Sequence, residues 1–219
     1  MTYSKDSFLA LDQMVQIARM KGLEGICVTD HDSMGLKEYA AEYSKDTGFP
    51  IFVGIEYYSL QGDIVAFGIE DYPTERIPAQ DFIDLVNAQG GVCFAAHPFR
   101  NNNRGLEENL RKVKGLHGLE VLNGSTSVEA CQKAARYALE LGLFTLGSSD
   151  CHVPEKVGVC ATYFPERFHT MEGFLDAFRK GQMKPAYYAG GKYHVLELKE
   201  QQKSKIPFTF YAFNDRMYL

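Results

Sequence analysis

Short apolar runs recur along the chain, and each of them ends abruptly in polar or ionisable side chains. Residues 25–28 form one such run and are followed at once by Thr29, Asp30, His31 and Asp32. Later apolar runs end in the same way at residues 56, 97–98, 120–123 and 148–152. Because an uninterrupted apolar run is typical of a parallel strand buried on both faces, the pattern predicts strands that bring polar side chains to one edge of a sheet.

Segments with helical spacing of apolar residues separate these runs. We predict strands over residues 26–29, 51–55, 92–96, 119–122, 143–147 and 185–188, and helices over residues 7–22, 33–45, 77–90, 107–113, 127–141 and 170–180. Residues 57–60 and 64–67 are expected to form a short antiparallel hairpin, standing as a flap beside the sheet. The alternation of strand and helix predicts a parallel α/β sheet with right-handed crossovers.

An open doubly wound sheet and a barrel both satisfy this order of elements. No glycine-rich phosphate fingerprint follows a predicted strand, which disfavours a nucleotide-binding open sheet. Polar residues follow nearly every strand, whereas an open sheet gathers its site at one switch point, so the pattern favours a barrel. We expect a barrel domain over residues 1–198, with the hairpin inserted at about 57–68, and a C-terminal tail over residues 199–219.

Composition narrows the class of protein. The chain has 219 residues, of which 45% are hydrophobic, so it is long enough for one large core. Its formal net charge of −5 disfavours a nucleic-acid groove, and we expect at most a small nucleotide as a nucleic-acid ligand. No stretch approaches the ~20 apolar residues of a membrane span. The five cysteines form no CxxC pair, which fits a reducing compartment, so we predict a cytoplasmic protein.

The motifs at the strand ends resemble those of the polymerase and histidinol phosphatase family, the PHP domains. The matching segments are Thr29-Asp30-His31-Asp32, Gly54-Ile55-Glu56, Ala96-His97-Pro98, Glu120-Val121-Leu122-Asn123 and Ser149-Asp150-Cys151-His152, in the family's order. The resemblance implies a distorted (βα)7 TIM-like barrel with two or three divalent metal ions at its carboxyl rim, and usually phosphoester hydrolysis. It also makes Asp6 a candidate metal ligand.

One feature departs from the family pattern. PHP domains begin with a strand ending in His-x-His, and those imidazoles hold a metal ion, whereas no such strand precedes residue 7 here. We interpret the difference as a chain begun too late or as a degenerate natural variant. Either would lower metal occupancy, because affinity depends on the number and geometry of the ligands. Either would also open a barrel edge, which we expect residues 208–211 or a second copy of the chain to cover.

Five strand-end residues are the leading candidate metal ligands. His31 lies between two aspartates, and Asp150 and His152 point to the same side of an extended segment because one residue separates them. Glu56 suits a carboxylate that bridges two cations at the ~3.5 to 4 Å spacing of binuclear hydrolases. His97 is favoured as a ligand, although a histidine packed in a loop is the structural alternative.

Four further residues have two interpretations each. Asp63 either contacts a metal ion or its water, or is an ordinary turn aspartate after a glycine. Asn123 either orients substrate or ends its strand. Arg100 and Arg104 follow the His97 motif, where a guanidinium can hold a phosphate in bidentate fashion, but they are equally well explained as solvated loop charges.

The ligand set favours a metal-dependent phosphoesterase that acts on a small phosphorylated substrate with a metal-activated water. Zinc, manganese and iron all suit mixed nitrogen and oxygen ligands. Glu56 and Asp150 would take part in catalysis through the metal site, and Asp30 would serve as a partner of the ligands or as the acid for the leaving oxygen. Two alternatives stay open: a catalytically impaired metal-binding or ligand-binding protein of the same fold, and a metallo-hydrolase of C–N or C–O bonds.

Overall fold

A curled sheet and five helices make up the described part of the chain. The structure, a computed structural model, describes residues 9–198, 208–211 and 217–218. Its strands are β1 (Leu23–His31), β2 (Ile51–Tyr58), β3 (Asp63–Phe67), β4 (Val92–Ala95), β5 (Gly118–Asn123), β6 (Phe144–Ser148), β7 (Cys160–Tyr163), β8 (Lys184–Ala189), β9 (Lys192–Leu198), β10 (Phe208–Tyr211) and β11 (Met217–Tyr218). Its helices are α1 (Leu11–Met20), α2 (Lys37–Thr47), α3 (Ala79–Ala88), α4 (Val128–Leu141) and α5 (Met171–Arg179), with short 3-10 helices η1 (Glu107–Arg111) and η2 (Pro154–Lys156).

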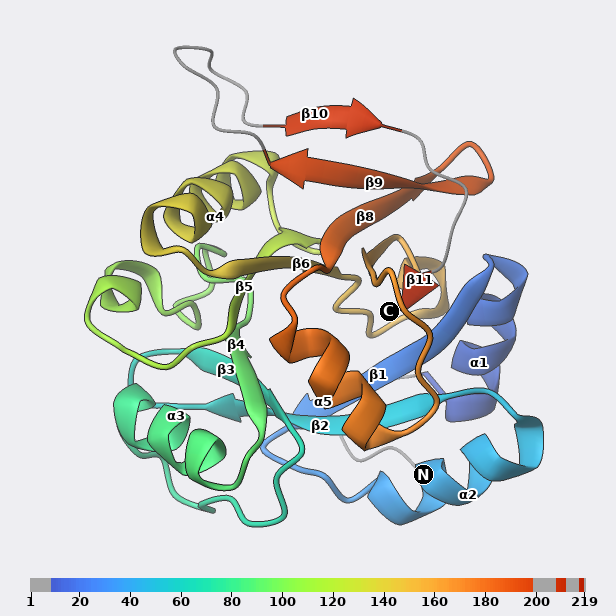
Figure 1. Cartoon of the computed structure of the whole chain (residues 1–219), viewed down its shortest axis with the longest axis horizontal. Helices are drawn as coiled ribbons and strands as arrows, with labels where there is room; N and C mark the ends of the chain where they lie inside the picture. The colour runs from blue at the N-terminus through green and yellow to red at the C-terminus, as the bar shows by residue number, and fades with distance from the viewer. Residues whose placement is uncertain (1–8, 199–207, 212–216, 219) are drawn as a thin grey trace.

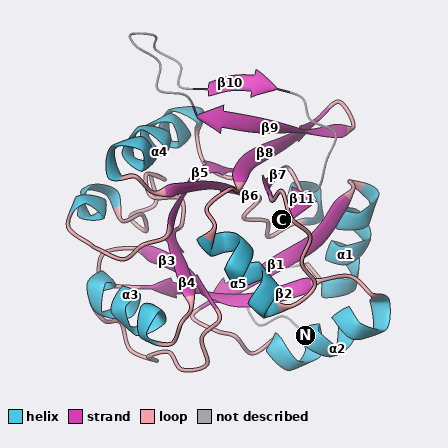
Figure 2. Ribbon diagram, viewed as in Figure 1, coloured by secondary structure: helices cyan, strands magenta, loops and turns pink. Residues whose placement is uncertain are grey.

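The strands of the described residues form one sheet in the order β10-β9-β8-β7-β11-β1-β2-β3-β4-β5-β6. Figure 1 shows that this sheet curls around α5, while α1 to α4 lie on its outer side. The same arrangement is visible by secondary structure in Figure 2. The fold is therefore mixed α/β with a curled, half-barrel sheet, which agrees with the barrel prediction in class and curvature, but the strands do not repeat as seven βα units.

The predicted hairpin is part of the curled sheet. β3 pairs antiparallel with both β2 and β4, and it thereby joins them into one sheet. The expectation of a flap beside the sheet was wrong, because β3 is completely buried, is apolar after Asp63, and must be covered on both faces. This placement puts Asp63, the first residue of β3, opposite the carboxyl end of β2 at Tyr58.

The other parallel units follow the prediction closely. β1 pairs in parallel with β2, and β5 pairs in parallel with β6. α4 lies between the latter two strands in sequence; the Ser127 side chain caps its first turn, and Gly142 ends it with a φ of 65°. The helix predicted over residues 107–113 is instead the short helix η1.

The C-terminal strands pair differently from the prediction. β7 and β9 were not predicted, and they flank β8 in antiparallel fashion. Residues 208–211, the predicted cover of the open edge, form β10 and pair with β9. β11 is the strand that lies beside β1, in parallel with it, and it pairs antiparallel with β7 on its other side. Cover by a second copy of the chain stays a prediction.

Helix α5 fills the inside of the curl with aromatic side chains. Phe174 lies 5.1 Å from Phe52 and 5.0 Å from Phe67 between ring centroids, and Phe178 lies 5.9 Å from Phe94. Burying one such side chain stabilises the fold by roughly 1.5–3 kcal/mol. α5 therefore closes the inside of the sheet and leaves the carboxyl ends of the strands for polar residues.

The described helices are short. The longest of them, α4, has 14 residues, and none in the described part of the chain combines the length and the apolar character that a membrane crossing needs.

Candidate metal centre

The carboxyl ends of five strands converge on one cavity. This cavity has a volume of about 150 Å³. Its polar lining comes from the strand ends predicted to carry the chemistry, and its inner wall comes from apolar residues of the sheet and α5. The polar residues lining it include Asp30, His31, Glu56, His97, Glu120, Asp150 and His152, and the apolar ones include Val65, Phe67, Phe94, Leu146, Phe174 and Phe178.

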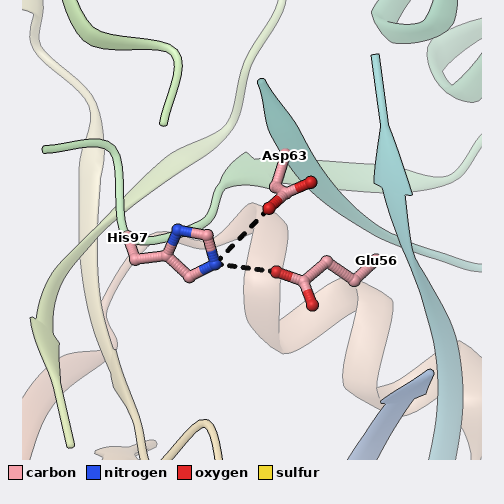
Figure 3. Close-up of side chains that lie close together, drawn as sticks. All are labelled: Glu56, Asp63 and His97. Atoms are coloured by element: carbon pink, nitrogen blue, oxygen red, sulfur yellow. Dashed lines mark hydrogen bonds and ion pairs between the residues drawn. The ribbon is translucent and has the colours of Figure 1, made fainter. Parts of the chain in front are cut away.

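Four residues meet at one side of this cavity, and we call them the glutamate centre: His31, Glu56, Asp63 and His97. The Glu56 carboxylate lies between two imidazoles, with Oε1 at 2.9 Å from His97 Nε2 and Oε2 at 3.0 Å from His31 Nδ1. Asp63 Oδ2 is 3.6 Å from the same His97 Nε2. Figure 3 shows both carboxylates turned toward this one nitrogen.

Strand register holds the glutamate centre together. His31 and Glu56 are paired neighbours in the parallel β1–β2 ladder. Asp63 is reached through a tight turn at Gly62, whose φ is 150° and where a Cβ atom would meet the backbone of Gly105 at 2.6 Å. His97 follows β4 with a φ of 27°, an unusual value for a residue other than glycine. Its backbone N–H donates to Glu120 Oε2 at 2.7 Å, which fixes this conformation.

The electrostatics of the centre favour one ionised glutamate between histidines. Burial pushes the pKa of Glu56 upward, but the hydrogen bonds from His31 and His97 outweigh it and leave this pKa below its usual range. Burial also raises the pKa of Asp63 to about 6, against the opposing effect of Arg104. For His97, burial lowers the pKa, and the carboxylates of Glu56 and Glu120 overcome that effect and raise it. The buried charges therefore depend on one another.

Arg104 belongs to this centre through Asp63. Its Nε donates to Asp63 Oδ2 at 2.6 Å and its Nη2 donates to Asp63 Oδ1 at 2.8 Å. The same Nη2 lies 3.4 Å from His31 Nδ1. Asp63 is fully buried, so this bidentate pair compensates a charge that water does not reach.

A second group of side chains lies beside the same cavity, and we call it the aspartate centre: Arg100, Asn123, Asp150 and His152, of which Asp150 and His152 line the cavity. Arg100 Nη2 donates to Asp150 Oδ2 and, at 2.6 Å, to Asn123 Oδ1. His152 Nδ1 is 3.7 Å from Asp150 Oδ1. The two centres approach each other at His31 and His152, whose ring centroids are 6.1 Å apart.

The donors of the glutamate centre fit a divalent cation. Glu56, Asp63 and His97 each offer one ligand atom, and these three atoms lie within 4.8 Å of one another. Two carboxylate oxygens and one imidazole nitrogen suit zinc, manganese or iron. His97 Nδ1 is buried without a hydrogen-bond partner among the described residues, so the ring is held through its other nitrogen, which faces the carboxylates.

Most of the predicted site residues lie in the two centres. His31, Glu56, Asp63 and His97 form the glutamate centre, and Asn123, Asp150, His152 and Arg100 form the aspartate centre. Asp30 lines the cavity at the end of β1, and Arg104 is turned toward Asp63. Asp6 lies outside the described residues.

One residue of the site had no role assigned from sequence. Glu120 is buried in β5, accepts from the His97 backbone and from Asn123 Nδ2 at 2.8 Å, and also accepts from the Ser148 hydroxyl. It links the two centres. Its position inside an apolar strand is the sequence signal that could have identified Glu120, because a charged residue is rarely buried without partners.

Comparison with known proteins places this cavity in a recognised fold. The family described as PHP-associated matches residues 128–183. An uncharacterised protein of Methanocaldococcus jannaschii is 24% identical over 110 residues, which is 50% of this chain and 64% of that protein. The matched part therefore spans less than two thirds of this curated relative.

Solved structures share the architecture at low sequence identity. A Bifidobacterium adolescentis protein to which metal-dependent phosphoesterase activity is ascribed is 19% identical, with a TM-score of 0.58 over 68% of this chain and 84% of that one. The lesion-specific endonuclease EndoQ of Pyrococcus furiosus is 16% identical, with a TM-score of 0.61 over 84% of this chain and 55% of that one. At identities this low, the TM-scores show that the proteins share a fold and nothing more.

Proposed function

We infer that the chain belongs to the PHP-domain family, because the PHP-associated family model matches residues 128–183. On this premise we propose that it is a metal-dependent hydrolase, most specifically a phosphoesterase acting on a small phosphate ester or nucleotide. The observation that carries the proposal is the convergence of Glu56, Asp63 and His97, whose ligand atoms lie within 4.8 Å of one another beside a cavity. Buried carboxylates and imidazoles at this spacing are the chemistry that divalent hydrolases use.

The roles of the residues follow from their positions. A bound divalent cation would polarise the phosphoryl group and make water acidic enough to react near neutral pH. Glu56 and His97 would hold it, and the low pKa of Glu56 keeps that carboxylate available as an anionic ligand. Asp30 and His152 line the same cavity and are the candidates for moving a proton to the leaving oxygen.

Arg100 is the candidate phosphate ligand. Its Nε donates to Thr126 Oγ1 at 3.0 Å and its Nη2 to Asn123 and Asp150, so the guanidinium is fixed in orientation. Among the described residues, no hydrogen bond involves Nη1. Its side chain is 18% exposed and is bound to Asp150, which lines the cavity. A phosphate held beside Asp150 would therefore find a pre-positioned cationic donor. Asn123, held in the same network, would orient the substrate.

The test is phosphate release by the full-length protein. The protein would be freed of metal, loaded in turn with zinc, manganese or iron(II), and assayed against phosphomonoesters, mononucleotides and a short phosphodiester. We expect metal-dependent release of phosphate or of a free alcohol, and its loss in Glu56→Gln. Glu129→Gln, which changes an exposed glutamate of α4, is the matched control and should keep full activity.

Two other outcomes would support the alternatives. Tight metal binding without turnover of any phosphoester would indicate an impaired metal-binding protein. Release of ammonia or free acid from amides or carboxylic esters, without phosphate release, would indicate a hydrolase of C–N or C–O bonds.

A further inference from the structure

Arg104 occupies an unusual position for a cationic side chain in a metal centre. Its guanidinium binds both oxygens of Asp63, at 2.6 and 2.8 Å, and its Nη2 also approaches His31 Nδ1 at 3.4 Å. Asp63 and His31 are two of the side chains that converge around Glu56. A positive charge of the chain itself therefore lies among the donors that would otherwise face a cation.

The two oxygens of Glu56 show which part of the centre Arg104 fills. Oε1 faces His97 Nε2 at 2.9 Å, and Asp63 Oδ2 lies 3.6 Å from the same nitrogen, so these three atoms outline one cation position. Oε2 faces His31 Nδ1 at 3.0 Å. Among the described residues, Glu56, Asp63 and His97 are the group that brings ligand atoms within 4.8 Å of one another, and His31 does not complete a second group of this kind. On the His31 side of Glu56, Arg104 Nη2 instead lies 3.4 Å from His31 Nδ1 and 2.8 Å from Asp63 Oδ1.

Arg104 is held at this position by more than its ion pair. The guanidinium carbon stacks 4.4 Å from the centre of the Tyr58 ring. The backbone carbonyl of Arg104 accepts from Asp63 N at 2.7 Å, and its backbone N–H donates to Asn102 Oδ1 at 3.1 Å. The Gly62 turn packs against this loop so closely that a Cβ atom would meet Arg104 O at 2.8 Å. The guanidinium and its carboxylate are thus built into one rigid corner.

Charge balance favours a single ion in this corner. Glu56 and Asp63 contribute two negative charges, and Arg104 contributes one positive charge at hydrogen-bond distance. One divalent ion at the first position would bring the summed charge of these three side chains and the ion to about +1, so no excess negative charge of the three remains to attract a second ion. A second divalent ion would have to share Asp63 Oδ1 and His31 with a guanidinium in direct contact, and like charges at that distance repel strongly.

We propose that this chain binds one divalent ion at Glu56, Asp63 and His97, and that the Arg104 guanidinium takes the place of the second ion of a binuclear site. The proposal rests on the proposed function for the presence of the first ion. It goes further in assigning the number of ions and in giving Arg104 the role of a fixed positive charge. Arg104 then acts as a positioning residue for Asp63 and as an electrostatic substitute for a metal.

The first experiment uses the unaltered full-length protein and manganese(II). Metal-free protein is titrated with Mn²⁺, and bound manganese is counted after equilibrium dialysis while its electron paramagnetic resonance spectrum is recorded. We expect saturation at one ion per chain, with the six-line spectrum of isolated Mn²⁺ at every ratio. Two ions per chain with a spin-coupled spectrum would overturn the assignment of Arg104 and leave the proposed function intact, whereas no bound ion would overturn both.

The second experiment removes the guanidinium. Arg104→Gln replaces the guanidinium by a shorter, neutral polar group, and the variant should bind a second Mn²⁺ at least about tenfold more tightly than the unaltered protein, because the competing charge is gone. A spin-coupled spectrum should appear with it. Arg76→Gln is the matched control, since the Arg76 guanidinium stacks on the same Tyr58 ring at 3.9 Å, whereas among the described residues the ion pair of Asp63 with an arginine is made by Arg104.

The variant is interpretable only if it folds, so its far-ultraviolet circular dichroism is compared with that of Arg76→Gln. A folded Arg104→Gln protein that still saturates at one Mn²⁺ would overturn the proposal. Should Arg104→Gln fail to fold, the double variant Asp63→Asn/Arg104→Gln removes both buried charges together, and the count in the unaltered protein remains decisive in either case.

Discussion

The carboxyl rim and the aromatic interior of the curled sheet are built on opposite principles. The rim buries Glu56, Asp63, His97 and Glu120, and each of them depends on a specific hydrogen bond or ion pair. The interior around Phe174 buries rings that pack by shape alone. Removing the charged groups of the rim from water costs free energy, whereas burying the apolar rings of the interior stabilises the fold.

This difference means that the two regions should respond to different experiments. The interior supplies the free energy of folding, and it holds the strands whose ends carry the rim. We propose that the rim supplies binding and chemistry, and its buried charges are balanced by one another. A substitution in one region should leave the characteristic property of the other largely intact.

The largest effect is expected from Phe174→Ala. Phe174 is 2% exposed and contacts several other phenylalanines, so its truncation should lower the free energy of unfolding by about 3–5 kcal/mol. Urea denaturation followed by circular dichroism measures this change. Leu60→Ala, at a side chain that is 60% exposed, should change it by less than about 0.5 kcal/mol. Metal affinity of the folded Phe174→Ala protein should stay near that of the unaltered chain.

Glu56→Gln should lower the affinity for the divalent ion rather than the stability of the fold. Loss of an anionic ligand should weaken the affinity for the divalent ion by more than about 100-fold, because even the loss of an outer contact to a metal ligand costs 10–100-fold. Isothermal titration with Mn²⁺ gives the affinity directly. If Glu56→Gln bound Mn²⁺ as tightly as Glu129→Gln, Glu56 would not be a metal ligand, and the role given to the rim would be wrong.

Arg100→Gln also changes the rim, and its effect, on KM for the substrate, should be smaller. We expect KM for the phosphorylated substrate to rise about tenfold, because a hydrogen bond to a charged group contributes roughly 1.5–3 kcal/mol, while Mn²⁺ affinity changes little. Steady-state kinetics separates KM from kcat. Arg136→Gln, at an exposed position of α4, is the control. An unchanged KM in Arg100→Gln would remove Arg100 from the phosphate site.

The smallest effect concerns His117, which lies against the interior. Burial, with the nearby charge of Arg179, lowers its pKa, and its Nδ1 accepts from Cys93 N at 3.3 Å. The unfolded chain therefore binds more protons than the folded one just below the usual histidine pKa of about 6.5, and stability falls as the pH falls through that range. His117→Asn keeps an acceptor for Cys93 N–H and loses the titration.

The free energy of unfolding of the unaltered protein and of His117→Asn should thus be compared by urea denaturation at pH 7, 6 and 5. We expect the unaltered protein to lose stability relative to the variant as the pH is lowered. A difference between the two proteins that stays constant over this range would contradict the assignment.

The sequence predicts the rim better than the interior, and the reason is physical. Glu56 and His97 follow apolar runs, and strands placed side by side must bring such ends together. The role of Asp63 was ambiguous because it depends on whether β3 is a strand of the main sheet. The sequence of a two-stranded hairpin is the same whether the hairpin joins the sheet or projects from it. The strand β7 was missed because four residues, Cys160–Tyr163, carry too weak an alternation to be recognised.

Long-range pairing accounts for what the sequence does not predict. The helix α5 has an ordinary amphipathic pattern, which does not reveal that its apolar side enters the inside of the curled sheet. The pairing of Arg104 with Asp63 joins residues 41 positions apart, and a loop arginine is normally solvated. The position of β11 beside β1 likewise follows from tertiary contacts alone.

The most direct test of the metal centre is an anomalous-scattering map of a crystal of the full chain grown with Mn²⁺. We predict one strong peak within about 2.0–2.3 Å of Glu56 Oε1, Asp63 Oδ2 and His97 Nε2, at distances typical of such ligands, with the Arg104 guanidinium still bound to Asp63. A fully loaded crystal whose peaks all lie away from these three atoms would contradict it.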